Sequence, residues 1–233
     1  MHQSINKYKF FLYFFFFFFI FLSSVLNIQF LENIQNKFNL KNINIYGLSD
    51  SQKKIIEIEL KEIENINIFT LSDEKVLEKI TKFDFLENIK VNKIIPSTVN
   101  IYVSETTILG STQRNGEKFY IGNNGKFINS NQIIKIHNTP TVFGEFKIEE
   151  YLNLINILND YQLDIGSIKK YFYYKNGRWD LLFSNDLTLM LPSQNIDNSL
   201  KIYNKLFNND NFKNIKIIDL RITNQIILTN KDE

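Results

Sequence analysis

The sequence predicts an α+β protein in which a single N-terminal transmembrane helix precedes two folded segments. First, residues 10–26 form a run of 17 residues without a charge. Second, residues 38–106 show strand and helix patterns in the order β-α-α-β-β. Third, from residue 107 onward, strand patterns separated by turn residues predict a mainly antiparallel β domain with two helices.

The apolar run is extended at lower hydrophobicity to Leu31, so we predict a helix over residues 10–31. A helix needs about 20 mostly apolar residues to cross ~30 Å of hydrocarbon, and this run is close to that length. Lys7 and Lys9 precede it without an acid, whereas the flank that follows carries both signs of charge. The positive-inside rule therefore predicts that residues 1–9 form a short cytoplasmic tail and that the remainder is exported.

A cleavable signal peptide is the main alternative, because a basic start followed by an apolar run suits both interpretations. Its hydrophobic region spans only about 7–15 residues and ends at a small-x-small cleavage site. Here the run is longer, and Ser23 and Ser24 followed by Val25 make a poor site. A buried core helix is a third alternative, although nine of the twelve residues 10–21 are Phe, without a polar stripe. We favour an uncleaved anchor.

Composition argues against several classes of function. The net charge is +2, and no basic block with interleaved aromatics suggests a nucleic-acid partner. The chain has no Cys for disulfides. Its two histidines are His2 and His137. The chain therefore has too few Cys and His residues for a Cys/His zinc site, and almost none for Ser-His-Asp catalysis. We expect neither a metal nor a cofactor, and place His137 in a loop.

The first exported segment opens with a strand in which Ile43 and Ile45 alternate with Asn residues. Ser49 and Gln52 have capping-box spacing and predict the start of a helix. The apolar residues of this helix recur at i, i+4 and i+7, at Ile56, Leu60 and Ile63.

A second helix is predicted over residues 72–83, with Ser72 as N-cap and two acids in its first turn. Ile89 and Val91 then alternate with polar residues, and a further alternating strand starts at Pro96. These two strands predict a hairpin that completes the β-α-α-β-β order.

The second exported segment begins with a hairpin of residues 119–121 and 126–128 around a Gly-Asn-Asn-Gly turn. Residues 139–144 are predicted as a turn leading to a helix. The apolar stripe of this helix consists of Ile148, Tyr151, Leu152, Ile155 and Leu158.

The rest of this segment alternates between strands and turns, with one further helix. Asn176-Gly177 predicts a tight turn. Asp197 is predicted to cap the second helix. The predicted strands cover residues 168–174, 178–183, 187–191, 215–220 and 226–229.

Four motifs carry a resemblance to known proteins: IIPSTVNIYVSE (94–105), NTPTVFG (138–144), GRWDLLFSNDLTLMLP (177–192) and IIDLRITNQIIL (217–228). The first segment resembles a POTRA domain. With the anchor and the motif order, the chain resembles the FtsQ (DivIB) family of bacterial cell-division proteins, of the Gram-negative, alphaproteobacterial type. The resemblance implies a POTRA domain over 38–106 and a β domain over 107–230. The family usually has Asp at the position of Asn124, a difference that should hardly matter to the turn.

The resemblance implies a scaffold without enzymatic activity, cofactor or small-molecule substrate. It would cross the inner membrane once at the division septum, with its N-terminus in the cytoplasm and its C-terminal domain in the periplasm. Its β domain is implied to bind the FtsB–FtsL pair and so to link early ring proteins to septal peptidoglycan synthesis. Other division proteins are implied to contact the POTRA domain, for which residues 72–83 are the expected element.

The implied partner-binding site lies at the C-terminal end of the β domain, where a partner strand adds to the sheet. Its residues are Arg221, Ile222, Asn224, Gln225, Ile226, Ile227, Leu228 and Thr229. Arg221 would pair either with a partner carboxylate or with an acid of its own chain. The sequence leaves open which alternate residues of the last strand face the core. Trp179 is a hot-spot candidate by residue type, but its strand favours core packing.

Two other functions compete with the scaffold. A POTRA-bearing periplasmic component of an outer-membrane assembly or secretion system would need a β-barrel or tandem POTRA copies, and ~120 residues are too few for a large barrel. A periplasmic cell-wall hydrolase would have Asp180, Asp186 and Glu145 as candidate carboxylates. These acids stand in turns or at alternating strand positions, where we expect solvated side chains.

Overall fold

The computed structural model describes residues 7–25, 28–133, 138–207, 214–222 and 225–231. His137 lies outside the described residues. The chain divides into two compact units. The first comprises Met1–Lys82 and Asn88–Ser104, and the second comprises Phe83–Glu87 and Glu105–Glu233.

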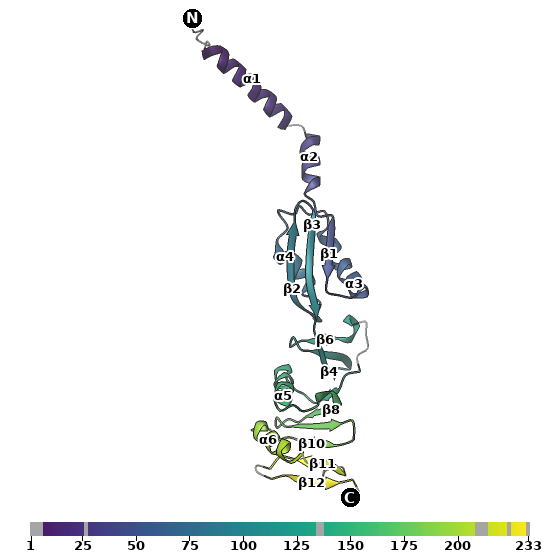
Figure 1. Ribbon diagram of the computed structural model, residues 1–233. Coiled ribbons are helices and arrows are strands. Elements are labelled where there is room, and N and C mark those ends of the chain that lie inside the picture. The colour runs from purple at the N-terminus through teal and green to yellow at the C-terminus, as the bar shows by residue number, and fades with distance from the viewer. Residues whose placement is uncertain (1–6, 26–27, 134–137, 208–213, 223–224, 232–233) are drawn as a thin grey trace. The chain divides into compact units, whose positions relative to one another are not determined.

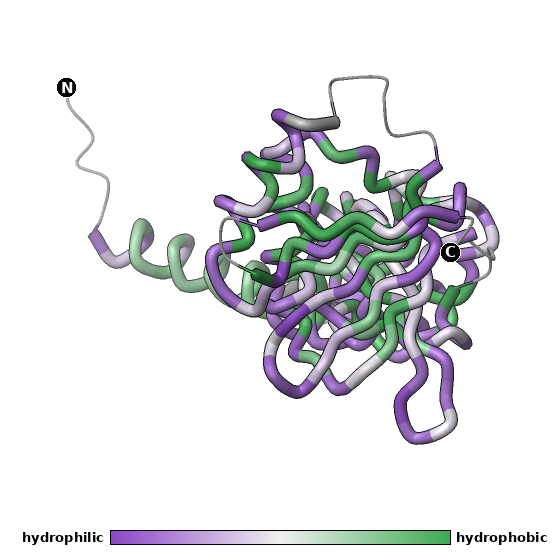
Figure 2. Tube along the Cα trace, turned by 90° about the horizontal axis from the view of Figure 1, so that it is seen from below, coloured by the Kyte–Doolittle hydropathy of each residue, from purple (hydrophilic) through white to green (hydrophobic). Residues whose placement is uncertain are grey.

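Two helices, α1 (Lys7–Val25) and α2 (Ile28–Lys37), stand where the sequence predicts one helix over residues 10–31. The sequence turns polar at α2, which carries Glu32 and ends at Lys37. In α1 the Phe side chains are 48–75% exposed, and Figure 2 shows this helix, near the end marked N, as hydrophobic along most of its length. Within the described residues, we find no helix with both the length and the apolar character that a membrane crossing requires.

The first unit contains a three-stranded sheet in the order β1-β3-β2, with β1 parallel to β3 (Figure 1). The chain order is strand, helix, helix, strand, strand, which confirms the predicted order. The closing strand begins at Thr98, two residues after the predicted Pro96. The elements are β1 (Asn42–Tyr46), α3 (Asp50–Leu60), the 3-10 turn η1 (Lys61–Ile63), α4 (Asp73–Ile80), β2 (Leu86–Ile94) and β3 (Thr98–Glu105).

Both predicted helix caps of this unit are confirmed. The Gln52 side-chain Oε1 accepts hydrogen bonds from the Ser49 backbone N–H at 3.3 Å and from the Ser49 hydroxyl at 2.6 Å. The Ser72 hydroxyl oxygen accepts one from the Lys75 backbone N–H at 3.2 Å. Such hydrogen bonds at the N-cap fix where each helix begins. Ile56, Leu60 and Ile63 are buried, as predicted for the first of these helices.

The second unit contains a nine-stranded sheet in the order β12-β11-β10-β9-β8-β7-β4-β5-β6. Its described pairings are mainly antiparallel, and those of β4 with β7, β7 with β8 and β10 with β11 are parallel. Helices α5 (Ile148–Asp160) and α6 (Ile196–Phe207) lie on one side of the strands (Figure 1). The strands are β4 (Ile108–Arg114), β5 (Glu117–Gly122), β6 (Phe127–Asn129), β7 (Thr141–Phe143), β8 (Ile168–Tyr173), β9 (Trp179–Phe183), β10 (Thr188–Met190), β11 (Ile215–Asp219) and β12 (Ile227–Asn230); short 3-10 turns follow β6 (η2, Ser130–Gln132) and precede β8 (η3, Ile165–Ser167).

A mainly antiparallel sheet with two helices is therefore confirmed, with four local corrections. The segment predicted as a turn over residues 139–144 contains strand β7, and β4 had no predicted counterpart. In α5 Leu154 is buried, whereas the predicted Leu152 is only partly buried. Asp197 lies inside the first turn of α6 instead of capping it, where its charge still complements the helix dipole.

Trp179 lies in the core between the sheet and α5 and is 3% exposed. Its ring centroid is 4.7 Å from that of Tyr173 and 5.8 Å from that of Phe146. These contacts confirm core packing as the role of the single Trp.

Asn124, at the turn between β5 and β6, does more than shape that turn. Its side-chain oxygen accepts a hydrogen bond from the Lys126 backbone N–H at 3.2 Å, a bond that Asp could also accept. Its amide N–H donates to the Asp84 carbonyl at 2.8 Å, which Asp could not do. The amide thus ties residues 83–87 to the turn within the second unit.

We expect Asn124→Asp to lower the free energy of unfolding by about 1–3 kcal/mol, because it removes a donor and sets a carboxylate against a carbonyl. Urea denaturation followed by circular dichroism measures this loss. Asn123→Asp is the matched control, because Asn123 is exposed on the same turn. Equal stability of the two variants would contradict a role for the amide.

Candidate functional site

Strand β12 stands at one end of the described nine-stranded sheet, where β11 is its neighbour (Figure 1). The two strands are antiparallel, with Ile217 opposite Thr229, Ile218 opposite Leu228 and Asp219 opposite Ile227. In the described sheet no further strand follows β12. The prediction that the last strand is an edge is therefore confirmed, and such an edge offers N–H and C=O groups to another strand.

The hydrogen bonds identify which main-chain groups of β12 point outward. The Lys231 N–H donates to the Asn214 carbonyl at 2.9 Å, so it points toward β11. Main-chain groups alternate sides along a strand, and the irregularity in this pair lies on β11, between Ile215 and Ile217. The groups of Thr229 therefore also face β11, whereas those of Leu228 face the free edge.

The register also shows which side chains of β12 face the core. Leu228 lies opposite the buried Ile218, so it belongs to the face that the helices cover, although it is 40% exposed. Ile226 packs against the same core. Ile227 lies opposite Asp219, on the other face, and is 47% exposed. The edge therefore has an exposed apolar side chain on each face.

The structure brings most of the predicted site residues to this end of the sheet. Arg221, Ile222 and Gln225 are exposed, and Thr229 is half-buried. The Gln225 N–H donates to the Ile222 carbonyl at 3.1 Å. Asn224 lies outside the described residues.

Arg221 is paired within its own chain. Its Nε donates to Asp219 Oδ1 at 2.8 Å, and its backbone N–H donates to the same oxygen at 2.9 Å. The side-chain hydrogen bond lowers the pKa of Asp219 and raises that of Arg221. Of the two roles that the sequence left open, the structure shows the internal ion pair.

Arg178 and Asp180 form a second charged pair that the sequence analysis missed. Asp180 is 4% exposed, which corrects the expectation of a solvated acid. Arg178 Nε lies 3.7 Å from Asp180 Oδ1, and both atoms are buried without a hydrogen-bond partner. The Arg178 guanidinium stacks over the Tyr174 ring at 4.0 Å. The sequence does contain a signal for such pairs, because an Arg and an Asp stand two residues apart both at 178–180 and at 219–221.

Asp180 and Asp219 lie on the same face of the sheet, because both are aligned with Met190 of β10. Their pKa values shift in opposite directions. Burial raises the pKa of Asp180. A hydrogen bond from Tyr174 and the charge of Arg178 lower this pKa, but by less than burial raises it. For Asp219 the hydrogen bond from Arg221 outweighs the effect of burial and lowers the pKa.

These shifts predict opposite pH dependences for Asp219→Asn and Asp180→Asn. The lowered pKa of Asp219 stabilises the fold above its ordinary value of 3.8, and this contribution is lost as the pH falls through the folded pKa. The raised pKa of Asp180 contributes stability below 3.8 that is lost as the pH rises through its folded pKa. As the pH rises from below 3.8, the stability of Asp219→Asn should therefore fall relative to that of the parent protein, and the stability of Asp180→Asn should rise relative to it.

Urea denaturation at several pH values checks both signs. If the stabilities of the two variants changed with pH in the same direction, the opposite pKa shifts of Asp180 and Asp219 would be contradicted. Asp186→Asn, at the exposed turn between β9 and β10, is the control.

No metal-binding cluster of three or more His, Cys, Asp or Glu side chains occurs in the part of the chain that the structure describes. Of the other candidate acids, Glu145 and Asp186 are exposed. The described geometry therefore offers a strand edge with flanking charges, which is suited to contact with another polypeptide.

Comparison with known proteins identifies the family. A family model described as cell division protein FtsQ/DivIB, C-terminal, matches residues 111–221, and one described as POTRA domain, FtsQ-type, matches residues 38–106. The chain belongs to the FtsQ/DivIB family. The C-terminal match ends at Arg221, so the residues of β12 lie beyond it.

The relatives found are cell division proteins FtsQ from alphaproteobacteria. The one from Rickettsia bellii is 26% identical over 194 residues, which cover 81% of this chain and 71% of that protein. The one from Rhizobium radiobacter is 22% identical over 149 residues, which cover 63% of this chain and 71% of that protein. The match to the one from Agrobacterium fabrum has the same identity and length but spans 47% of that protein.

A solved structure was also found, that of the major extracytoplasmic domain of the cell division protein DivIB from Geobacillus stearothermophilus. It has a TM-score of 0.32 and 13% sequence identity, and the match covers 43% of this chain and 89% of that one.

Proposed function

We propose that this FtsQ/DivIB family member is a bitopic inner-membrane scaffold of the division septum, whose periplasmic β domain binds the FtsB–FtsL pair by adding a partner strand to β12. Through that contact it would link early ring proteins to septal peptidoglycan synthesis. The observation that carries the proposal is the free edge of β12, with exposed apolar side chains on both faces.

Strand addition suits this edge for two physical reasons. The main-chain N–H and C=O groups of Leu228 face outward, so a partner strand can pair with them without disturbing the β11–β12 ladder. Ile222, Ile227 and Leu228 are 40–49% exposed, so a bound strand would bury apolar surface on both faces. A partner acid near Arg221 would compete with Asp219 for the guanidinium.

The membrane part of the proposal rests on the sequence. The uncharged run of residues 10–26 and the positive charges before it favour an N-terminal anchor with the N-terminus in the cytoplasm. The exposed Phe side chains of α1 favour an apolar environment. On this proposal the POTRA domain contacts other division proteins through the region of α4.

Imaging of a fluorescent fusion in dividing cells, combined with co-purification of FtsB and FtsL, tests the proposal. We expect a band at midcell in constricting cells and recovery of both partners from detergent extracts. A uniform envelope signal without either partner would contradict the scaffold role and would favour the secretion alternative.

A further inference from the structure

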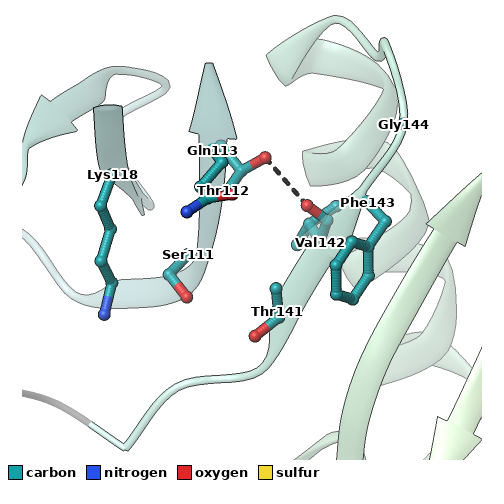
Figure 3. Close-up of a pocket in the computed structure, with 8 residues that line it drawn as sticks. All are labelled: Ser111, Thr112, Gln113, Lys118, Thr141, Val142, Phe143 and Gly144. Carbon is teal, nitrogen blue, oxygen red and sulfur yellow. Dashed lines mark hydrogen bonds between the residues drawn. The ribbon is translucent and has the colours of Figure 1, made fainter. Parts of the chain in front are cut away.

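The nine-stranded sheet has a weak seam between β4 and β7. These strands are joined by one residue pair, Ser111 with Thr141, whereas β4 pairs with β5 from Ile108 to Arg114. The Ser111 N–H donates to the Pro140 carbonyl at 2.8 Å, and the ladder between the two strands ends there. A cavity of about 570 Å³ lies at this seam (Figure 3).

Side chains hold the two strands together where the ladder ends. The Thr112 hydroxyl donates to the Val142 carbonyl at 2.8 Å, the bond dashed in Figure 3. Arg114 Nη2 donates to the Phe146 carbonyl at 2.7 Å, with its guanidinium 3.7 Å from the centre of the Phe127 ring. These contacts hold β4 beside the segment that follows β7 without backbone pairing between them.

The seam leaves main-chain groups of β4 available to a ligand. The Ser111 N–H points toward β7, so the N–H of Gln113, two residues on, points the same way beyond the end of the ladder. Gly144, directly after β7, has a φ of +107°, and a Cβ at this position would lie 2.3 Å from the Tyr173 carbonyl oxygen. This glycine lets the chain pass close to β8 where the strand β7 ends.

The lining combines hydrogen-bonding groups, one cation and an apolar surface. The hydroxyls of Ser111 and Thr141 share one face of the sheet, because these residues are register partners. Lys118 brings an ammonium that lies 5.0 Å from the centre of the Tyr120 ring. Phe143 is 42% exposed and stacks on Phe172 with ring centroids 5.1 Å apart. None of the described residues that line the cavity is acidic.

We propose that this cavity binds a short acidic peptide in extended conformation. The peptide backbone accepts a hydrogen bond from the Gln113 N–H, so that it adds a partial strand where the β4–β7 ladder stops. A carboxylate of the peptide pairs with Lys118, and an apolar side chain packs on Phe143. This site is separate from β12 and does not depend on the function proposed above.

Fluorescence anisotropy with the full-length chain in detergent micelles tests the proposal. The probe is a fluorescein-labelled hexapeptide of alternating Glu and Val, and a Lys/Val hexapeptide serves as the charge-reversed comparison. We expect saturable binding of the first peptide only. Lys118→Gln should weaken it by roughly threefold, as for an exposed ion pair, and Lys118→Glu should weaken it further by repulsion. Lys201→Gln, on the exposed side of α6, should leave it unchanged.

A second pair of variants tests the backbone contact. Gln113→Pro removes the N–H that faces the seam, whereas Gln113→Ala keeps it, so only the proline variant should lose binding. Circular dichroism confirms that both are folded. Equal binding of the Gln113 variants, equal binding of the two peptides, or insensitivity to Lys118→Glu would each overturn the proposal. Loss of binding in Leu228→Pro would place the peptide at β12 and would overturn it as well.

Discussion

Leu228→Pro is expected to abolish capture of the FtsB–FtsL pair while leaving the β domain folded. Proline lacks an N–H and is tolerated in a sheet only where that group faces away from the ladder. The Leu228 N–H faces the free edge, because the N–H groups of Thr229 and Lys231 face β11. The substitution therefore removes a donor that only a partner strand would use. A pull-down from detergent-solubilised membranes measures the loss.

Two further variants at the same edge distinguish the loss of strand pairing from the loss of a side chain and from a loss of sheet stability. Leu228→Ala keeps the N–H and removes the exposed side chain, so we expect weakened but measurable capture. Thr229→Pro removes an N–H that faces β11, so it should lower the stability of the sheet as well as capture. Full capture by a folded Leu228→Pro variant would refute strand addition at β12.

The sequence was most informative where periodicity and local capping agree. Ser49 with Gln52 and Ser72 with its acidic first turn predicted both helix starts in the first unit, because these signals act within one helical turn. Strand patterns bounded by turn residues likewise predicted most strands of the second unit. Three-residue β7 and the polar β4 lack such a pattern, since their places depend on neighbours that are distant in sequence.

The edge position of the last strand was predictable, but the contacts around it were not. The motif at residues 217–228 pointed to this end of the sheet through a family resemblance, and the edge position of the last strand is confirmed. The sequence could not show that Arg221 pairs with Asp219 or that Asp180 is buried beside Arg178. A period-two pattern distinguishes the two faces of a strand, but it does not say which face neighbouring side chains will cover.

Trp179→Ala is expected to have the largest effect on stability, about 3–5 kcal/mol, because it removes a large buried side chain whose site cannot collapse fully. The indole is 3% exposed and lies within 6 Å of three aromatic rings, with the Tyr151 centroid at 5.9 Å. Urea denaturation followed by circular dichroism is the suitable measurement, because the substitution removes the only Trp. Phe143→Ala is the control, since Phe143 is 42% exposed and should cost far less.

The same variant discriminates between the two roles that the sequence suggested for Trp179. If it packs the core, Trp179→Ala should lower stability, and capture of FtsB–FtsL should fall only as far as the folded fraction falls. A direct contact residue would behave in the opposite way, losing capture with little loss of stability. Because the indole faces α5 and β12 lies at the end of the same sheet, we expect capture to return when the fold is stabilised by an osmolyte.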